Sequence, residues 1–134
     1  MGIFGLNILG IIVATFIGMV LGAIWYSPFL FGKQWMECIG KTPETLGSTT
    51  GPMIGSIAAS LMTAIGVSIV FSLLSVDSLS LGITVALTLG ILIIFPAMLS
   101  DSLFCGWGKR LLIIQSSYRA VSILLMSIAY VYLA

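Results

Sequence analysis

Long apolar runs without a charged residue make up most of the chain. No charge occurs within residues 1–32, 45–76 or 78–100. Because a helix that crosses a bilayer needs about 20 mostly apolar residues, each run has room for one span, and a fourth follows near the C-terminus, interrupted by Arg119. The pattern predicts an all-α polytopic membrane protein, a four-helix transmembrane bundle formed as one domain over residues 1–134. The expected spans are about 4–25, 52–74, 79–103 and 111–134.

Composition narrows the possible classes further. Hydrophobic residues make up 60% of the chain and charged residues 7%, with five Lys or Arg against four Asp or Glu. A soluble domain carries about 25% charged residues, so these few charges cannot cover a water-facing surface, and a soluble globular enzyme is excluded. A net charge of +1 provides no basic patch for nucleic acid. The expected partners are the lipid bilayer and other membrane subunits or further copies of this chain.

A short interfacial helix is predicted after the first span. Pro28 lacks an N–H and disfavours helical angles at the residue before it, so the first helix should end near Tyr26. The following segment, about 28–40, contains an amphipathic stretch from Gly32 to Ile39 that suits the membrane surface. It serves either as an anchor or as a lid over the bundle. The i,i+4 ladder expected on its polar face comprises Lys33, Glu37 and Lys41.

Small residues recur at helical spacing in three of the spans. Helices in lipid associate through close backbone approach, which such residues permit. These seams either pack one bundle internally, or at least one of them faces another subunit. The expected packing positions are Gly18, Gly22, Ser56, Ser60, Ala64, Gly82, Ala86 and Gly90.

The last span carries a polar cluster at membrane depth. Arg119 lies near the middle of the hydrocarbon core, where a charge is costly and normally faces the bundle interior with a partner. Asp101 is the only carboxylate at comparable depth. The cluster is therefore either a ligand or ion site or a structural ion pair between Arg119 and Asp101. Its expected members are Asp101, Gln115, Tyr118, Arg119 and Ser122.

Residues for catalysis and metal binding are scarce. The chain has no His, the most common general acid or base, and no segment pairs two carboxylates in the membrane. Cys38 and Cys105 lie in connections expected in the reducing cytoplasm, so we expect free thiols. We therefore expect no catalytic residue, no cofactor and no metal site.

Two segments of the chain resemble a known family. The run Trp25-Tyr26-Ser27-Pro28, followed by Phe31-Gly32-Lys33 and by Trp35-Met36, is similar to the hallmark of domain-of-unknown-function family 1761. The stretch from Lys109 through Tyr118, followed by Val121-Ser122, is similar to the last-helix pattern of that family. The resemblance implies a small prokaryotic integral membrane protein of about four helices. It implies no activity and no catalytic residue.

Two functional hypotheses follow from these observations. The first is a structural or accessory subunit, held in a homo-oligomer or in a larger membrane complex by its small-residue seams. The alternative is an oligomeric small-solute or ion transporter or channel that uses the cluster of Asp101, Gln115, Tyr118 and Arg119. Four helices without an internal inverted repeat are narrow for alternating access, so this alternative requires an oligomer.

The distribution of basic residues predicts the orientation. Four spans place both termini on one side with the 75–78 loop, and that side has no Lys or Arg. The other side carries Lys33, Lys41, Lys109 and Arg110. Because cytoplasmic loops are enriched in Lys and Arg, we expect a multi-pass protein of the cell membrane. Its 26–51 and 104–110 connections should be cytoplasmic and its termini outside.

Cysteine labelling tests this orientation. Cys38 and Cys105 should resist a membrane-impermeant maleimide in intact cells and react with it in inverted vesicles. Labelling of both thiols in intact cells would reverse the assigned topology.

Overall fold

Helices account for nearly all the regular structure of the chain. The computed structural model describes residues 7–42, 44–48 and 50–133, and within these ranges it has no strand. The helices are α1 (Ile8–Trp25), α2 (Gly32–Ile39), α3 (Thr50–Leu73), α4 (Leu79–Leu87), the π-helix η2 (Thr88–Ile94), α5 (Phe95–Cys105) and α6 (Lys109–Leu133). Since α4, η2 and α5 follow one another without a break, the chain forms four helices long and apolar enough to cross a membrane.

The four expected spans and the short interfacial helix are therefore confirmed as helices. Residues 4–6 of the first expected span and residue 134 of the last lie outside the described residues. The amphipathic stretch forms α2 with the bounds that the sequence predicts, Gly32–Ile39. Because Gly40 follows it in a left-handed conformation, with φ of 69°, α2 ends there.

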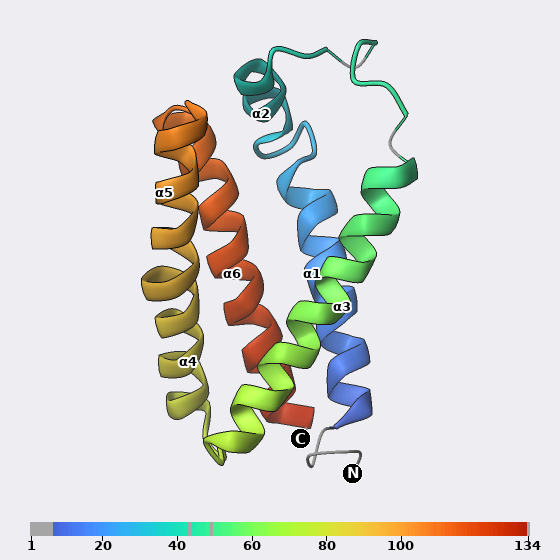
Figure 1. The fold of residues 1–134 in the computed structure, drawn as a ribbon. Helices are drawn as coiled ribbons and strands as arrows, with labels where there is room; N and C mark the ends of the chain where they lie inside the picture. Colours follow the sequence, from blue (N-terminus) through green and yellow to red (C-terminus); the bar gives the residue numbers. More distant parts are fainter. Residues whose placement is uncertain (1–6, 43, 49, 134) are drawn as a thin grey trace.

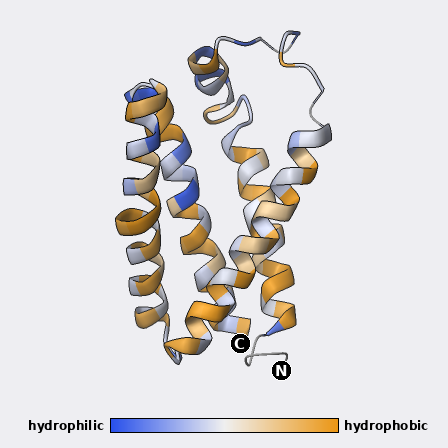
Figure 2. Cartoon of the chain, in the orientation of Figure 1, coloured by the Kyte–Doolittle hydropathy of each residue, from blue (hydrophilic) through white to orange (hydrophobic). Residues whose placement is uncertain are grey.

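The two ends of the bundle differ in what they carry. Helix α2 and the α5–α6 turn lie at one end, and the start of α1 and the end of α6 lie with the α3–α4 turn at the other (Figure 1). We call the first the α2 end and the second the terminal end. Hydrophobic residues cover most of each long helix, and a strongly hydrophilic patch interrupts α6 (Figure 2). This arrangement suits an integral membrane protein.

Helix α6 is the central helix of the bundle. In its most apolar stretch 44% of the residues are buried, against 22% to 28% in the other three spans. Glycines let the neighbouring helices approach it closely. A Cβ atom at Gly22 of α1 would lie 3.0 Å from the Tyr118 hydroxyl oxygen, and one at Gly90 of η2 would lie 3.0 Å from the Ala120 Cα. Two of the small-residue seams therefore face α6.

The seam on α3 has two parts with different surroundings. Ser60, Ala64 and Ser68 are buried, and the Ser60 hydroxyl donates a 2.9 Å hydrogen bond to the Thr15 carbonyl of α1. The Ser68 hydroxyl is hydrogen-bonded to the Tyr130 hydroxyl of α6. Toward the α2 end, Ser56 is exposed. Helix α3 is therefore fixed to α1 and α6 along its middle and its terminal half.

The third span changes its helical pitch before Pro96. The amide of Phe95 donates to the carbonyl of Gly90, five residues earlier. A π-helical segment accommodates about one more residue per turn than an α-helix, and Pro96 cannot donate to Leu92 because it has no N–H. Beyond η2, the positions of the span that face α6 are therefore shifted by about one residue along the chain. Gly82, Ala86 and Gly90 are buried before it, and Ser102 is buried after it.

The close approach of α1 to α6 gives a stability test. Gly22→Leu should lower the free energy of unfolding by about 1–3 kcal/mol, because the added side chain displaces Tyr118. Gly66→Leu is the matched control, since a Cβ atom there meets nothing within 4 Å. Thermal unfolding in mild detergent measures both variants. Equal stability of the two variants would mean that α1 does not pack on α6 at Gly22.

Candidate functional site: an interhelical cleft around Arg119

The bundle contains a cleft between α3 and the third span. Helix α3 packs mainly on α1, whereas α4, η2 and α5 pack on α6. From the α3–α4 turn, α3 runs away from α4 and α5 toward the α2 end (Figure 1). A cavity of about 310 Å³ lies where these elements diverge, lined by residues of α1, α3, η2 and α6. We call this cavity the α3–η2 cleft.

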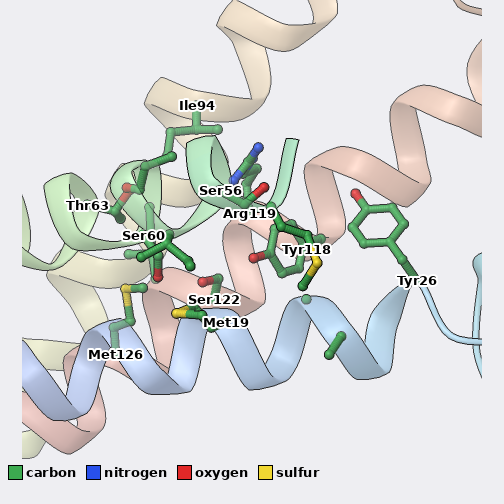
Figure 3. Close-up of a pocket in the computed structure, with 16 residues that line it drawn as sticks. Met19, Tyr26, Ser56, Ser60, Thr63, Ile94, Tyr118, Arg119, Ser122 and Met126 are labelled. Atoms are coloured by element: carbon green, nitrogen blue, oxygen red, sulfur yellow. The ribbon is translucent and has the colours of Figure 1, made fainter. Parts of the chain in front are cut away.

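The lining of the α3–η2 cleft combines one cation with hydroxyl groups and flexible apolar side chains. Figure 3 shows side chains of α3 and of α6 pointing from two sides into the same space. The polar lining residues are Tyr26, Ser56, Ser60, Thr63, Tyr118, Arg119 and Ser122. The methionines among the apolar ones are Met19, Met53 and Met126. Unbranched Met side chains repack easily, so this wall can adapt to what occupies the cleft.

Arg119 is an exposed cation inside a membrane span. It lies ten residues into α6 from Lys109, about 15 Å along the axis. Its Cζ atom is 5.1 Å from the centre of the Tyr118 ring. Among the described residues, the salt bridge that forms joins Arg110 to Glu37. Arg119 therefore has no carboxylate partner among those residues. A charge at this depth without a partner is costly in lipid.

Tyr118 joins the last helix to α1. Its hydroxyl donates a 2.9 Å hydrogen bond to the Gly18 carbonyl. Gly22 permits this contact, because a Cβ atom there would lie 3.0 Å from the Tyr118 hydroxyl oxygen. The ring centre of Tyr118 lies 6.4 Å from that of Trp25 and 5.5 Å from that of Tyr26. The two segments that resemble the family hallmark, one in the loop after α1 and the other in α6, therefore meet at Tyr118.

The loop between α1 and α2 closes one side of this aromatic group. Trp25 packs on Phe31 and Tyr26 packs on Trp35, with ring centres 5.0 Å and 5.3 Å apart. The Trp25 indole N–H donates a 3.0 Å hydrogen bond to the Ile114 carbonyl of α6. Burial raises the pKa of the Tyr26 phenol to about 12, so this phenol is protonated at neutral pH. The loop thus holds a neutral hydroxyl at the α2 end of the cleft.

Ser27, Pro28, Gly32 and Lys33 shape that loop rather than line the cleft. The Ser27 hydroxyl donates to the Ile24 carbonyl, and the Gly32 amide donates to the Ser27 carbonyl. A Cβ atom at Gly32 would collide with the carbonyl oxygen of Tyr26. Pro28 and Lys33 are exposed. The close approach of the Tyr26 backbone to residue 32 therefore explains why the loop has a glycine at that position.

The expected ion-pair ladder on α2 needs a correction. Glu37 pairs with Arg110 of α6, with 3.2 Å between Nη1 and Oε2. Among the described residues this is the salt bridge that forms, and neither Lys33 nor Lys41 takes part in it. The reason is that α2 lies beside the start of α6, which brings Arg110 within reach of Glu37, while Lys41 lies beyond the end of α2. This pair links α2 to the bundle.

The expected polar cluster also needs a correction. Tyr118, Arg119 and Ser122 line the cleft, but Asp101 and Gln115 do not. Asp101 is exposed on α5 while its neighbour Ser102 is buried. The π-helical segment before Pro96 accounts for this, because it turns Ser102 toward α6 in place of Asp101. Asp101 and Arg119, both within the described residues, therefore form no ion pair inside one chain.

Sequence reasoning missed the contribution of α3 to the site. Ser56 and Ser60 were expected to pack helices together, and Thr63 and Met53 had no expected role. In the structure all four line the cleft. The signal for Thr63 is weak, because a lone threonine in an apolar run usually bonds back to its own helix, as Thr63 does to the Ala59 carbonyl.

The two cysteines stay apart from this site. Cys38 is partly buried and Cys105 is exposed, and both are free thiols. Neither lines the cleft. Over residues 7–42, 44–48 and 50–133, no group of His, Cys, Asp and Glu side chains could hold a metal ion.

The fold and the cleft define a polytopic helical membrane protein in which Arg119, a cation without a carboxylate partner among the described residues, is exposed between the helices. The chain belongs to the family described as Protein of unknown function (DUF1761), whose model matches residues 9–131. The matched region includes the aromatic loop after α1, the cleft and nearly all of α6. Comparison with curated proteins and with solved structures gave no match.

Proposed function

We propose that this protein is an accessory or structural subunit of a membrane assembly, and that its α3–η2 cleft accepts a transmembrane helix of a partner. The observation that carries this proposal is Arg119, an exposed cation inside a span without a carboxylate partner among the described residues. A helix that brings a carboxylate to the cleft would neutralise this charge and shield it from lipid. The proposed role is binding, without catalysis.

The shape and lining of the cleft support a helix as the occupant. Ser56, Ala59, Ser60 and Thr63 of α3 line it, and small residues allow two helix backbones to approach closely. A Cβ atom built at Gly55 of the same helix also meets nothing within 4 Å. Helix α3 therefore still has room for a neighbour.

The proposal includes an orientation in the cell membrane. The α2 end carries Lys33, Lys41, Lys109 and Arg110, and the terminal end carries no Lys or Arg in the sequence. Under the positive-inside rule, α2 and the α5–α6 turn belong in the cytoplasm. The partner helix would then enter the cleft from within the bilayer.

Photo-crosslinking in native membranes tests the proposal. A benzoylphenylalanine at Thr63, in the cleft, should give a protein adduct of discrete mass. The same probe at Phe16, which is 63% exposed on α1 and outside this cleft, is the control and should give lipid adducts. The adduct at Thr63 should fall at least tenfold in Arg119→Gln, because that variant cannot pair with a carboxylate.

The same experiment has a contradicting outcome. If Thr63 yields only lipid adducts, or if its protein adduct persists unchanged in Arg119→Gln, the cleft does not bind a partner helix through this cation. Lys41→Gln serves as the charge control, because Lys41 lies beyond α2 and away from the cleft.

A further inference from the structure

Asp101 and Arg119 are the two charged residues within the expected spans 79–103 and 111–134. The spans at 4–25 and 52–74 contain none. The two side chains have opposite charge, both are exposed, and neither belongs to the ion pair that the described residues form. In lipid each charge needs a partner of the opposite sign. Among the described residues of one chain, the negative charge of Asp101 and the positive charge of Arg119 are therefore both without a partner.

We propose that the partner in the α3–η2 cleft is a second copy of this chain, whose Asp101 on α5 pairs with Arg119. This inference rests on the proposed function and names its partner. In a two-fold dimer the same contact occurs twice, because each copy offers the same surface to the other. Asp101 of the first copy meets Arg119 of the second, and Arg119 of the first meets Asp101 of the second.

The positions of the two residues along their helices suit such a dimer. A two-fold axis along the membrane normal keeps each residue at the same depth in both copies. Asp101 lies four residues before the end of α5 at Cys105 and Arg119 lies ten residues after the start of α6 at Lys109. At 1.5 Å per residue their Cα atoms differ in depth by about 9 Å.

The length of the Arg119 side chain allows it to bridge this difference. Its Cζ atom is 5.1 Å from the Tyr118 ring, and that ring packs on Tyr26 at the α2 end of α1. The long side chain of an arginine can extend several ångströms along a helix toward the membrane surface. A guanidinium that extends in this way would lie closer to the depth of Asp101.

The surface of α5 supports this role as well. Asp101 shares one face of α5 with Phe104, three residues later and 92% exposed, and with Ala97, four residues earlier and also exposed. These apolar side chains can pack in a partner cleft whose wall contains methionines. Helix α5 therefore presents a carboxylate within an apolar surface, and the cleft presents a cation within an apolar wall.

Charge exchange between two variants tests the pair directly. Asp101→Arg alone would place two guanidinium groups opposite each other in the dimer, and Arg119→Asp alone would place two carboxylates opposite each other. Each variant should self-associate at least tenfold more weakly than the native chain. A mixture of the two restores both pairs with reversed sign at one of them, so the mixed dimer should approach native affinity.

Energy transfer between donor-labelled and acceptor-labelled copies measures this association in phosphatidylcholine vesicles over a range of protein-to-lipid ratios. Asp77→Arg mixed with Arg119→Asp is the matched control and should associate more weakly than the first mixture, because Asp77 lies in the α3–α4 turn at the terminal end and this mixed dimer retains one contact between two carboxylates. Circular dichroism checks that each variant keeps its helix content. The neutral variants Asp101→Asn and Arg119→Gln should weaken association less than the charge-reversed ones.

Two outcomes would overturn the inference, and they differ from failure of the proposed function. If native copies do not associate while an Arg119-dependent adduct to another protein forms at Thr63, the subunit role stands and the second copy is wrong. If the native chain associates but the two charge-reversed variants together associate no better than either alone, the Asp101–Arg119 pair is wrong. Loss of the Arg119-dependent adduct altogether contradicts both proposals.

Discussion

The close approach of α1 to α6 at Gly18 and Gly22 is the contact on which the rest of the site depends. It leaves space for the Tyr118 side chain, whose hydroxyl reaches the Gly18 carbonyl and whose ring reaches Trp25 and Tyr26. Successive residues of an α-helix are turned by about 100°. Once Tyr118 is fixed against α1, Arg119 points to the side where α3 and the third span diverge. The position of the cation follows from that of the tyrosine.

The divergence of α3 opens the cleft beside this local contact. Helix α3 is fixed by the hydrogen bonds of Ser60 to α1 and of Ser68 to α6. The half of α3 that is nearer the α2 end diverges from the third span (Figure 1). If α3 lay alongside the third span over its whole length, Arg119 would be buried and would need a carboxylate from its own chain as a partner. In the open bundle the cation is exposed toward the bilayer. We propose that another molecule then supplies the partner for this charge.

The sequence predicts the parts of this structure that depend on local chemistry. Uncharged runs define the spans, Pro28 ends α1, and the small residues at Gly18, Gly22 and Gly90 mark faces that pack closely. These features depend on helix length, on the lost N–H of proline and on the absence of a side chain. Each can be read from a few neighbouring positions. The resemblance to the family likewise rests on two short segments, and they meet in the fold at Tyr118.

The parts that the sequence does not predict depend on geometry over longer distances. A straight α-helix would place Asp101 on the face of Ala86 and Gly90, but the π-helical segment moves Ser102 there instead. The pairing of Glu37 with Arg110 depends on how α2 lies beside α6. The cleft depends on the tilt of α3, which no residue of α3 encodes by itself. The sequence therefore predicts the importance of Arg119 but not the residues that surround it.

The most direct test of this account is the separation of α3 from α5 at the α2 end. Spin labels at Met53 and Leu99, which are 60% and 37% exposed, report it by pulsed electron resonance in nanodiscs that each hold one copy. A second pair at Leu73 and Leu81 reports the terminal end. The account predicts a clearly longer distance between the labels at 53 and 99 than between those at 73 and 81. Equal distances would mean that α3 lies alongside the third span, and that the cleft around Arg119 does not exist.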